Sequence, residues 1–173
     1  MMINMKMLLG GISLVVAALM LAGCGAQPIA CTEIGVAQGV SLNIAAPLAK
    51  DATKALVTIC VEEEECEAVE VELFTSTTTE SQGCEGDDPD DSCSAVAVPD
   101  GGRTGFAPFD WLPESEVQVV VALWDANDGQ ILLESATVTP KRIYPNGPQC
   151  DNGGVQLGLT VTQDGIISEV TTH

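Results

Sequence analysis

Carboxylates are the most abundant groups in this chain that could carry chemistry, and many of them are clustered. The segment 85–92, between Cys84 and Cys93, contains five carboxylates, and Glu62–Glu65 is a run of four. Clustered carboxylates can bind calcium, which takes six to eight oxygen ligands. The loop 85–92 has no recognised spacing of calcium ligands, so we expect a solvated acidic loop. Glu62–Glu65 could bind a cation or a basic partner, but we expect a solvated hairpin tip that blocks edge pairing.

The chain offers little for catalysis. Its single histidine is His173 at the C-terminal end, whereas catalysis by a nucleophile, a histidine and an acid needs a positioned imidazole. No nucleophile elbow, phosphate-binding loop or dinucleotide-binding pattern occurs. We therefore predict no catalytic residues, no cofactor and no enzyme activity.

The first residues have the pattern of a secretory signal. Lys6 supplies a positive charge, the apolar run Met7–Leu21 follows, and small residues close it. This run is shorter than the roughly 20 residues of a membrane-spanning helix, which favours a cleaved signal. The closing segment Leu21-Ala22-Gly23-Cys24 resembles the lipobox of bacterial lipoproteins, in which the cysteine is lipidated and the chain is cut before it.

The lipobox resemblance implies a signal peptide over residues 1–23, a lipid with fatty acids such as palmitate on Cys24, and a tether over 24–30. Residues 31–173 are then expected to form one domain of ordinary size. Two or more acyl chains anchor a protein stably, so we expect attachment to the extracytoplasmic side of the cell membrane, or to an outer membrane if the host has one. The alternative is an ordinary signal peptide cut near Ala22, with Cys24 as one more disulfide cysteine.

Six cysteines remain after Cys24, and an even number in an exported chain favours three disulfides. Cys60 and Cys66 lie at the two ends of a predicted hairpin tip, and Cys84 and Cys93 enclose the acidic loop. We therefore predict the disulfides Cys60–Cys66 and Cys84–Cys93, which leave Cys31–Cys150. A metal site is not predicted, because zinc sites usually contain Cys-x-x-Cys or several histidines.

The charge of the chain limits its partners. There are 6 basic and 25 acidic side chains, and the formal net charge is −19. Nucleic acid is not an expected partner, because its binding depends on lysine and arginine. A hydrophobic content of 46% favours a folded core over disorder, so the charge predicts an acidic, self-repelling surface. The expected partners are the membrane, through the lipid anchor, and an envelope protein or small ligand.

Short segments of alternating apolar and polar residues recur along the domain and predict β-strands. Ala46–Lys54 could form one helical turn, and Asp125–Gly129 predicts a hairpin turn. The expected strands are Gly39–Ile44, Ala55–Cys60, Ala68–Phe74, Ser94–Val98, Thr104–Pro108, Val117–Trp124, Ile131–Thr139 and Val155–Thr162, with Ile166-Ile167 after a further turn. We therefore predict an all-β sandwich of about seven to nine strands.

Leu112–Ala122 and the turn that follows resemble the late hairpin of immunoglobulin-like and fibronectin-III-like domains, which often place a Leu-Pro loop before an alternating strand. The resemblance implies a disulfide-stabilised, immunoglobulin-like β-sandwich. Val117 stands where the family often has tyrosine, so the strand topology is left open. The aromatic residues Phe106, Phe109, Trp111 and Trp124 are expected to fill the core.

Together these patterns predict a non-enzymatic, lipid-anchored module of the cell envelope that acts in binding, adhesion or an accessory role. One alternative is a calcium-stabilised, ligand-binding lipoprotein in which the loop 85–92 holds the ion. A hydrolase that uses two carboxylates is the less favoured alternative.

Overall fold

The computed structural model describes residues 30–32, 34–62, 65–86, 88, 90–150, 152–165 and 167–169. The chain divides into two units, Met1–Glu33 and Ile34–His173, and the second unit contains all the described strands. The predicted signal peptide, Cys24 and His173 lie outside the described residues. No helix within the described ranges is long and apolar enough to cross a membrane.

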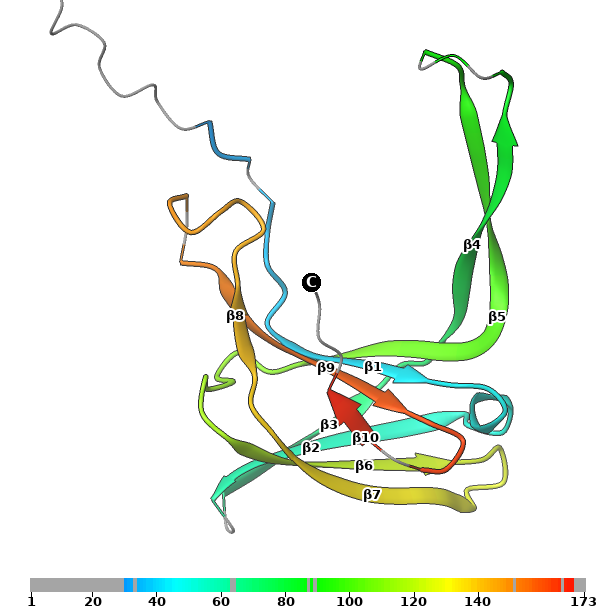
Figure 1. Ribbon diagram of the computed structural model, residues 1–173. Helices are drawn as coiled ribbons and strands as arrows, with labels where there is room; N and C mark the ends of the chain where they lie inside the picture. The colour runs from blue at the N-terminus through cyan, green and yellow to red at the C-terminus, as the bar shows by residue number, and fades with distance from the viewer. Residues whose placement is uncertain are drawn as a thin grey trace, which may run out of the picture. The chain divides into compact units, whose positions relative to one another are not determined.

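The second unit is a β-sandwich, so the predicted all-β class is confirmed (Figure 1). Its elements are β1 (Gly39–Ile44), η1 (Leu48–Lys50), β2 (Lys54–Glu62), β3 (Glu65–Val71), β4 (Phe74–Cys84), β5 (Cys93–Pro108), β6 (Val117–Trp124), β7 (Gln130–Val138), β8 (Lys141–Ile143), β9 (Gly154–Val161) and β10 (Ile167–Glu169). One sheet has the order β10-β9-β1-β5-β4, with β8 also paired to β9, and the other has the order β3-β2-β6-β7. Only the β1–β9 pair is parallel among the strand pairs described.

Alternating side chains of four strands fill the space between the sheets. Alternate residues of a strand point to opposite faces, and in β1, β2, β6 and β9 the inward set is apolar and buried. These residues are Val40, Leu42, Ile44, Ala55, Val57, Ile59, Val117, Val119, Val121, Leu123, Val155, Leu157, Leu159 and Val161. No polar or charged residue of the described part is buried, so the acidic residues described here lie at the surface.

Several predicted boundaries agree with the structure. β1 and β6 have the predicted limits, and η1 falls within the expected helical turn Ala46–Lys54. The Asp125–Gly129 hairpin turn is also present, because one oxygen of Asp125 accepts the backbone N–H groups of Asn127 and Gly129, each at 2.8 Å. Asp128 has a φ of 61°, the left-handed conformation that the turn requires.

Other predicted boundaries were wrong. Ala68–Phe74 is not one strand, because β3 ends at Val71 in one sheet and β4 begins at Phe74 in the other. The predicted strands Ser94–Val98 and Thr104–Pro108 are parts of β5, which continues through a bend. Apart from Phe74, the residues of β4 were not predicted to form a strand, and neither was the short strand β8. Ten strands are described where about seven to nine were predicted.

Candidate functional site

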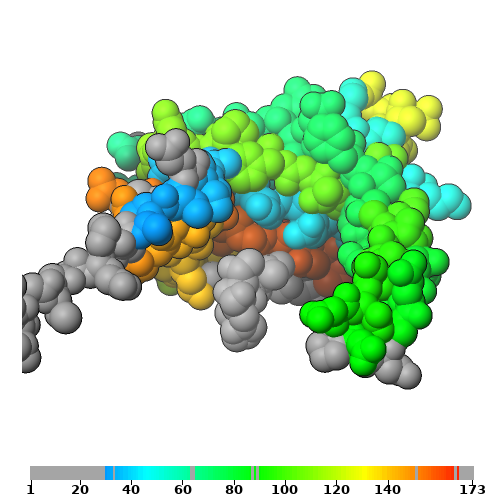
Figure 2. Space-filling view, turned by 90° about the horizontal axis from the view of Figure 1, so that it is seen from above, coloured from blue at the N-terminus to red at the C-terminus, as the bar shows by residue number. Residues whose placement is uncertain are grey.

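The most distinctive surface feature is an arm formed by Thr77–Cys84 of β4 and Cys93–Pro99 of β5. These segments pair only with each other among the described strands, because β1 pairs with β5 only from Arg103 onward. Figure 1 shows the arm rising away from the two sheets, and in Figure 2 its green residues lie at one edge of the domain. Every described residue of the arm strands is exposed except the half-buried Val98. The arm therefore adds almost nothing to the core.

The arm leaves the sheet at an elbow, where the register of β4 and β5 shifts between Thr75 and Thr77. Asp100 holds this elbow. One of its carboxylate oxygens accepts the Gly102 N–H at 2.8 Å and the other accepts the Ser76 hydroxyl at 2.9 Å. These two hydrogen bonds lower the pKa of Asp100 below its usual value of 3.8, and the bond from Gly102 has the larger effect. Gly101 adopts a φ of +84°, which favours glycine.

A hollow of about 330 Å³ with a mixed polar and apolar lining lies beside this elbow. Ser76, Asp100 and Arg103 line it from the arm side, and Asn43 and Thr160 line it from the sheet. The Arg103 guanidinium Nε donates to the carbonyl oxygen of Ala49 at 3.0 Å. Arg103 therefore ties the base of the arm to the segment that follows β1.

A disulfide closes the tip of the arm. Cys84 and Cys93 are directly opposite each other, with their Cα atoms 4.0 Å apart. Beyond them the Glu85 N–H donates to the Ser92 carbonyl at 3.0 Å, and the Asp88 N–H donates to an Asp91 carboxylate oxygen at 2.8 Å. The acidic segment is thus a tight loop, although Asp87 and Pro89 lie outside the described residues.

Calcium binding by the acidic loop 85–92 was the metal chemistry considered from the sequence. Within the described ranges, no three histidine, cysteine, aspartate or glutamate side chains are placed to hold a metal ion. Since Asp87 is not described, calcium binding by the loop stays a prediction. A rise in Tm on adding calcium, abolished by neutralising Asp88 and Asp90, would test it.

The second predicted disulfide is also present. Cys60 and Cys66 pair across β2 and β3, with Cα atoms 4.1 Å apart. Cys31 and Cys150 are each disulfide-bonded as well, which is compatible with the predicted Cys31–Cys150 pairing. Every cysteine of the described part of the chain is therefore oxidised. Glu62 and Glu65 are exposed beside the β2–β3 turn, whose residues 63 and 64 are not described.

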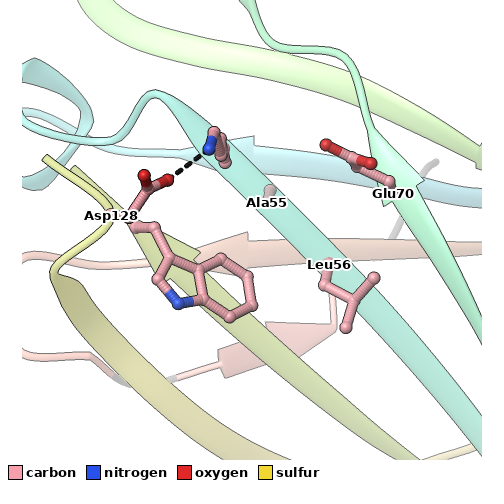
Figure 3. A pocket seen from close by; sticks show the side chains of 6 residues that line it. Ala55, Leu56, Glu70 and Asp128 are labelled. Carbon is pink, nitrogen blue, oxygen red and sulfur yellow. Dashed lines mark hydrogen bonds and ion pairs between the residues drawn. The ribbon is translucent and has the colours of Figure 1, made fainter. Parts of the chain in front are cut away.

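A shallow hollow of about 300 Å³ lies on the sheet β3-β2-β6-β7, and the half-buried Trp124 forms part of its wall. Figure 3 shows Glu70 and Asp128 on opposite sides of it, with Leu56 on β2. Lys54 is ion-paired with Asp128. The hydrogen bond and charge of Asp128, and then the charge of Glu70, raise the pKa of Lys54 above 10.5. The hollow offers an apolar wall beside the Lys54–Asp128 ion pair and the carboxylate of Glu70.

The aromatic residues do not all fill the core, which corrects the sequence prediction. Phe109 is buried and packs edge-on against Trp111, with ring centroids 6.0 Å apart. Trp111 is 37% exposed, and its indole N–H donates to Glu67. Trp111 therefore covers the buried Phe109 and joins the loop after β5 to the edge strand β3, because its polar N–H needs a partner.

Comparison of the chain with protein-family models, with curated proteins and with solved structures finds no match. The arm combines exposed strands, a covalently closed tip and a hydrogen-bonded base. The sequence indicated its disulfide and acidic loop, but not the outward course of its two strands.

Proposed function

We propose that this chain is a non-enzymatic binding module of the cell envelope, anchored through a lipid on Cys24, that contacts its partner with the arm. The signal-like segment before Cys24 supports export. Oxidation of all six described cysteines fits an extracytoplasmic compartment. The proposal therefore combines a location outside the cytoplasm, inferred from the signal-like segment, with the arm as the surface that contacts the partner.

The observation that carries the proposal is the exposure of the arm. An isolated two-stranded hairpin is marginally stable in water, and this one buries almost no side chain. It is nevertheless fixed at the tip by Cys84–Cys93 and at the base by Asp100. Seven strand steps from Thr77 to Cys84 span about 24 Å. A braced, exposed feature of this length suits contact with another molecule better than support of the core.

Lipid attachment is tested on the protein from its native host. We expect the intact mass of a species that begins at Cys24 and carries fatty acids, and we expect Cys24→Ser to lose both the lipid and membrane association. A mature chain that begins elsewhere, or an unmodified Cys24, would remove the anchor from the proposal.

The role of the arm is tested with a photoreactive residue placed in the full chain on intact cells. In one variant the photoreactive residue replaces the exposed Val96 on the arm. In the matched control it replaces the exposed Leu133 on the sandwich. We expect a cross-linked partner from position 96 and none from position 133. Equal labelling at both positions, or labelling at 133 alone, would contradict contact through the arm.

A further inference from the structure

The outer edge of β4 is an unpaired strand edge. β4 is the last strand of its sheet, and among the described strands it pairs with β5 alone. Backbone N–H and C=O groups on its other side are therefore available for another strand. Exposed edges of this kind are templates for strand addition by a second chain.

The usable part of this edge is short and regular. From Thr77 to Ser81 each residue of β4 faces one residue of β5, and register shifts lie on both sides of this stretch. Threonine favours the strand conformation. Lysine and proline, which often protect an edge from pairing, are absent from this stretch. By contrast, the edge strand β3 contains three glutamates in seven residues.

Charge indicates which chain would pair here. The arm and its loop contain six acidic residues, namely Glu80, Glu85, Asp87, Asp88, Asp90 and Asp91, and neither lysine nor arginine occurs from Ala55 to Gly102. A second copy would bring the same negative charge to the same place and be repelled. A strand with lysine or arginine at the end nearest the loop would be attracted, over a range of about 8 Å at physiological salt.

We propose that Thr77–Ser81 of β4 takes up an extended, basic segment of a partner protein as an added antiparallel strand, with the basic end beside the exposed acidic residues Glu85, Asp88 and Asp90. This proposal rests on the proposed function and names the chemistry of the partner. The antiparallel direction is the more stable one per residue. The closed tip and the hydrogen-bonded elbow reduce the ordering that binding must impose on the arm.

The test uses the full-length chain and the synthetic peptide Lys-Lys-Thr-Val-Thr-Val-Thr. β4 runs towards the tip, so an antiparallel peptide brings its N-terminal lysines to the acidic loop. We expect slower hydrogen exchange at the outward amides of Thr77–Ser81 when this peptide is present. The same peptide with alternate backbone nitrogens methylated should give no slowing, because it cannot form the ladder.

Matched variants separate strand pairing from general attraction between charges. Neutralising the arm with Glu80→Gln, Glu85→Gln and Asp90→Asn should weaken peptide binding about tenfold. The control changes Asp51→Asn, Glu62→Gln and Glu65→Gln remove the same charge from exposed positions outside the arm, and should leave the affinity unchanged.

Three results would overturn strand addition: no slowing at Thr77–Ser81, slowing at β3 or β7 in its place, or equal binding of the methylated peptide. If any of these occurs while position 96 still cross-links on cells, the binding module stands and only the strand mechanism fails. Loss of cross-linking itself would remove the proposed function.

Discussion

At the scale of single residues, Asp100 has the clearest local role. Its two carboxylate oxygens accept hydrogen bonds from two segments, one from Ser76 on β4 and one from Gly102 within β5. Both bonds favour the ionised form, so they oppose protonation of this side chain. The direction in which the arm leaves the sheet should therefore depend on this one negative charge.

We expect a carboxyl titration followed by NMR to place the pKa of Asp100 below 3.8. Since the folded-state pKa is lowered, the contribution of Asp100 to stability is complete above 3.8 and is lost as the pH falls through the lower, folded value. Ser76→Ala should move the pKa part of the way back towards 3.8. A pKa at or above 3.8 in the unmodified protein would contradict this account of the elbow.

Gly105 shows how closely β5 passes the connection between β3 and β4. A Cβ atom at this position would lie 2.4 Å from Val71 Cγ1 and 2.6 Å from the Glu72 carbonyl oxygen. Gly105→Ala should therefore lower the free energy of unfolding by about 1–3 kcal/mol, as measured by urea denaturation. Gly35→Ala is the control, because nothing lies within 4 Å of that Cβ position. A similar loss in both variants would argue against the close contact at Gly105.

At the scale of elements, the arm and the sandwich differ in what holds them. The sandwich is held by its apolar core, whereas the arm is held by backbone pairing, the elbow and the Cys84–Cys93 disulfide. Closing a loop of this size is worth about 2–3 kcal/mol in the chain-entropy model. Because the arm has little buried surface, that contribution acts mainly on the arm itself.

Replacing Cys84 and Cys93 together by serine should therefore open the arm locally. We expect faster hydrogen exchange at Thr77–Ser81, unchanged protection in the buried strand β6, and a small change in Tm. The paired change of Cys60 and Cys66 is the comparison, since Cys60 is only 8% exposed and its loss should lower the Tm of the sandwich. Global unfolding of the Cys84 and Cys93 variant would show that the arm supports the core after all.

The elements that the sequence predicted well are those with one buried face. β1 alternates apolar and polar residues, β6 is a largely apolar run, and the limits of both agree with the prediction. β4 was missed because Thr77–Ser81 is polar and exposed on both faces, so it carries no alternation. The bend in β5 was read as a break, because Pro99 and Gly101 usually interrupt strands.

The candidate sites were predictable only where covalent or local chemistry marked them. The spacing of Cys84 and Cys93 around acidic residues indicated a closed loop, and the structure contains that disulfide. The hollow beside Trp124 had no such signal, because Lys54, Glu70 and Asp128 come from two strands and a turn that meet only after folding. Asp100 was missed for the same reason, since its partner Ser76 is distant in sequence.

At the scale of the whole molecule, the net charge of −19 opposes compaction. No polar or charged residue is buried in the described part, so this repulsion acts between surface groups and is sensitive to salt. Raising sodium chloride from about 10 mM to about 0.5 M should therefore raise the Tm. In a variant with Glu62, Glu65 and Glu85 changed to Gln, the Tm should rise less when salt is added. A Tm that falls with added salt would show that attractive pairs outweigh the repulsion.

The antiparallel pairing of β1 with β5 determines how the domain would bear mechanical load. The chain enters β1 at Gly39, opposite Pro108, while the arm joins β5 near Arg103, opposite Ile44. A pull between a membrane tether and a partner on the arm would therefore act on opposite ends of this ladder. Its hydrogen bonds are perpendicular to the strands, so they would be sheared together and not broken one after another. With the proposed attachment at both ends, this ladder would resist a pull directed along its strands.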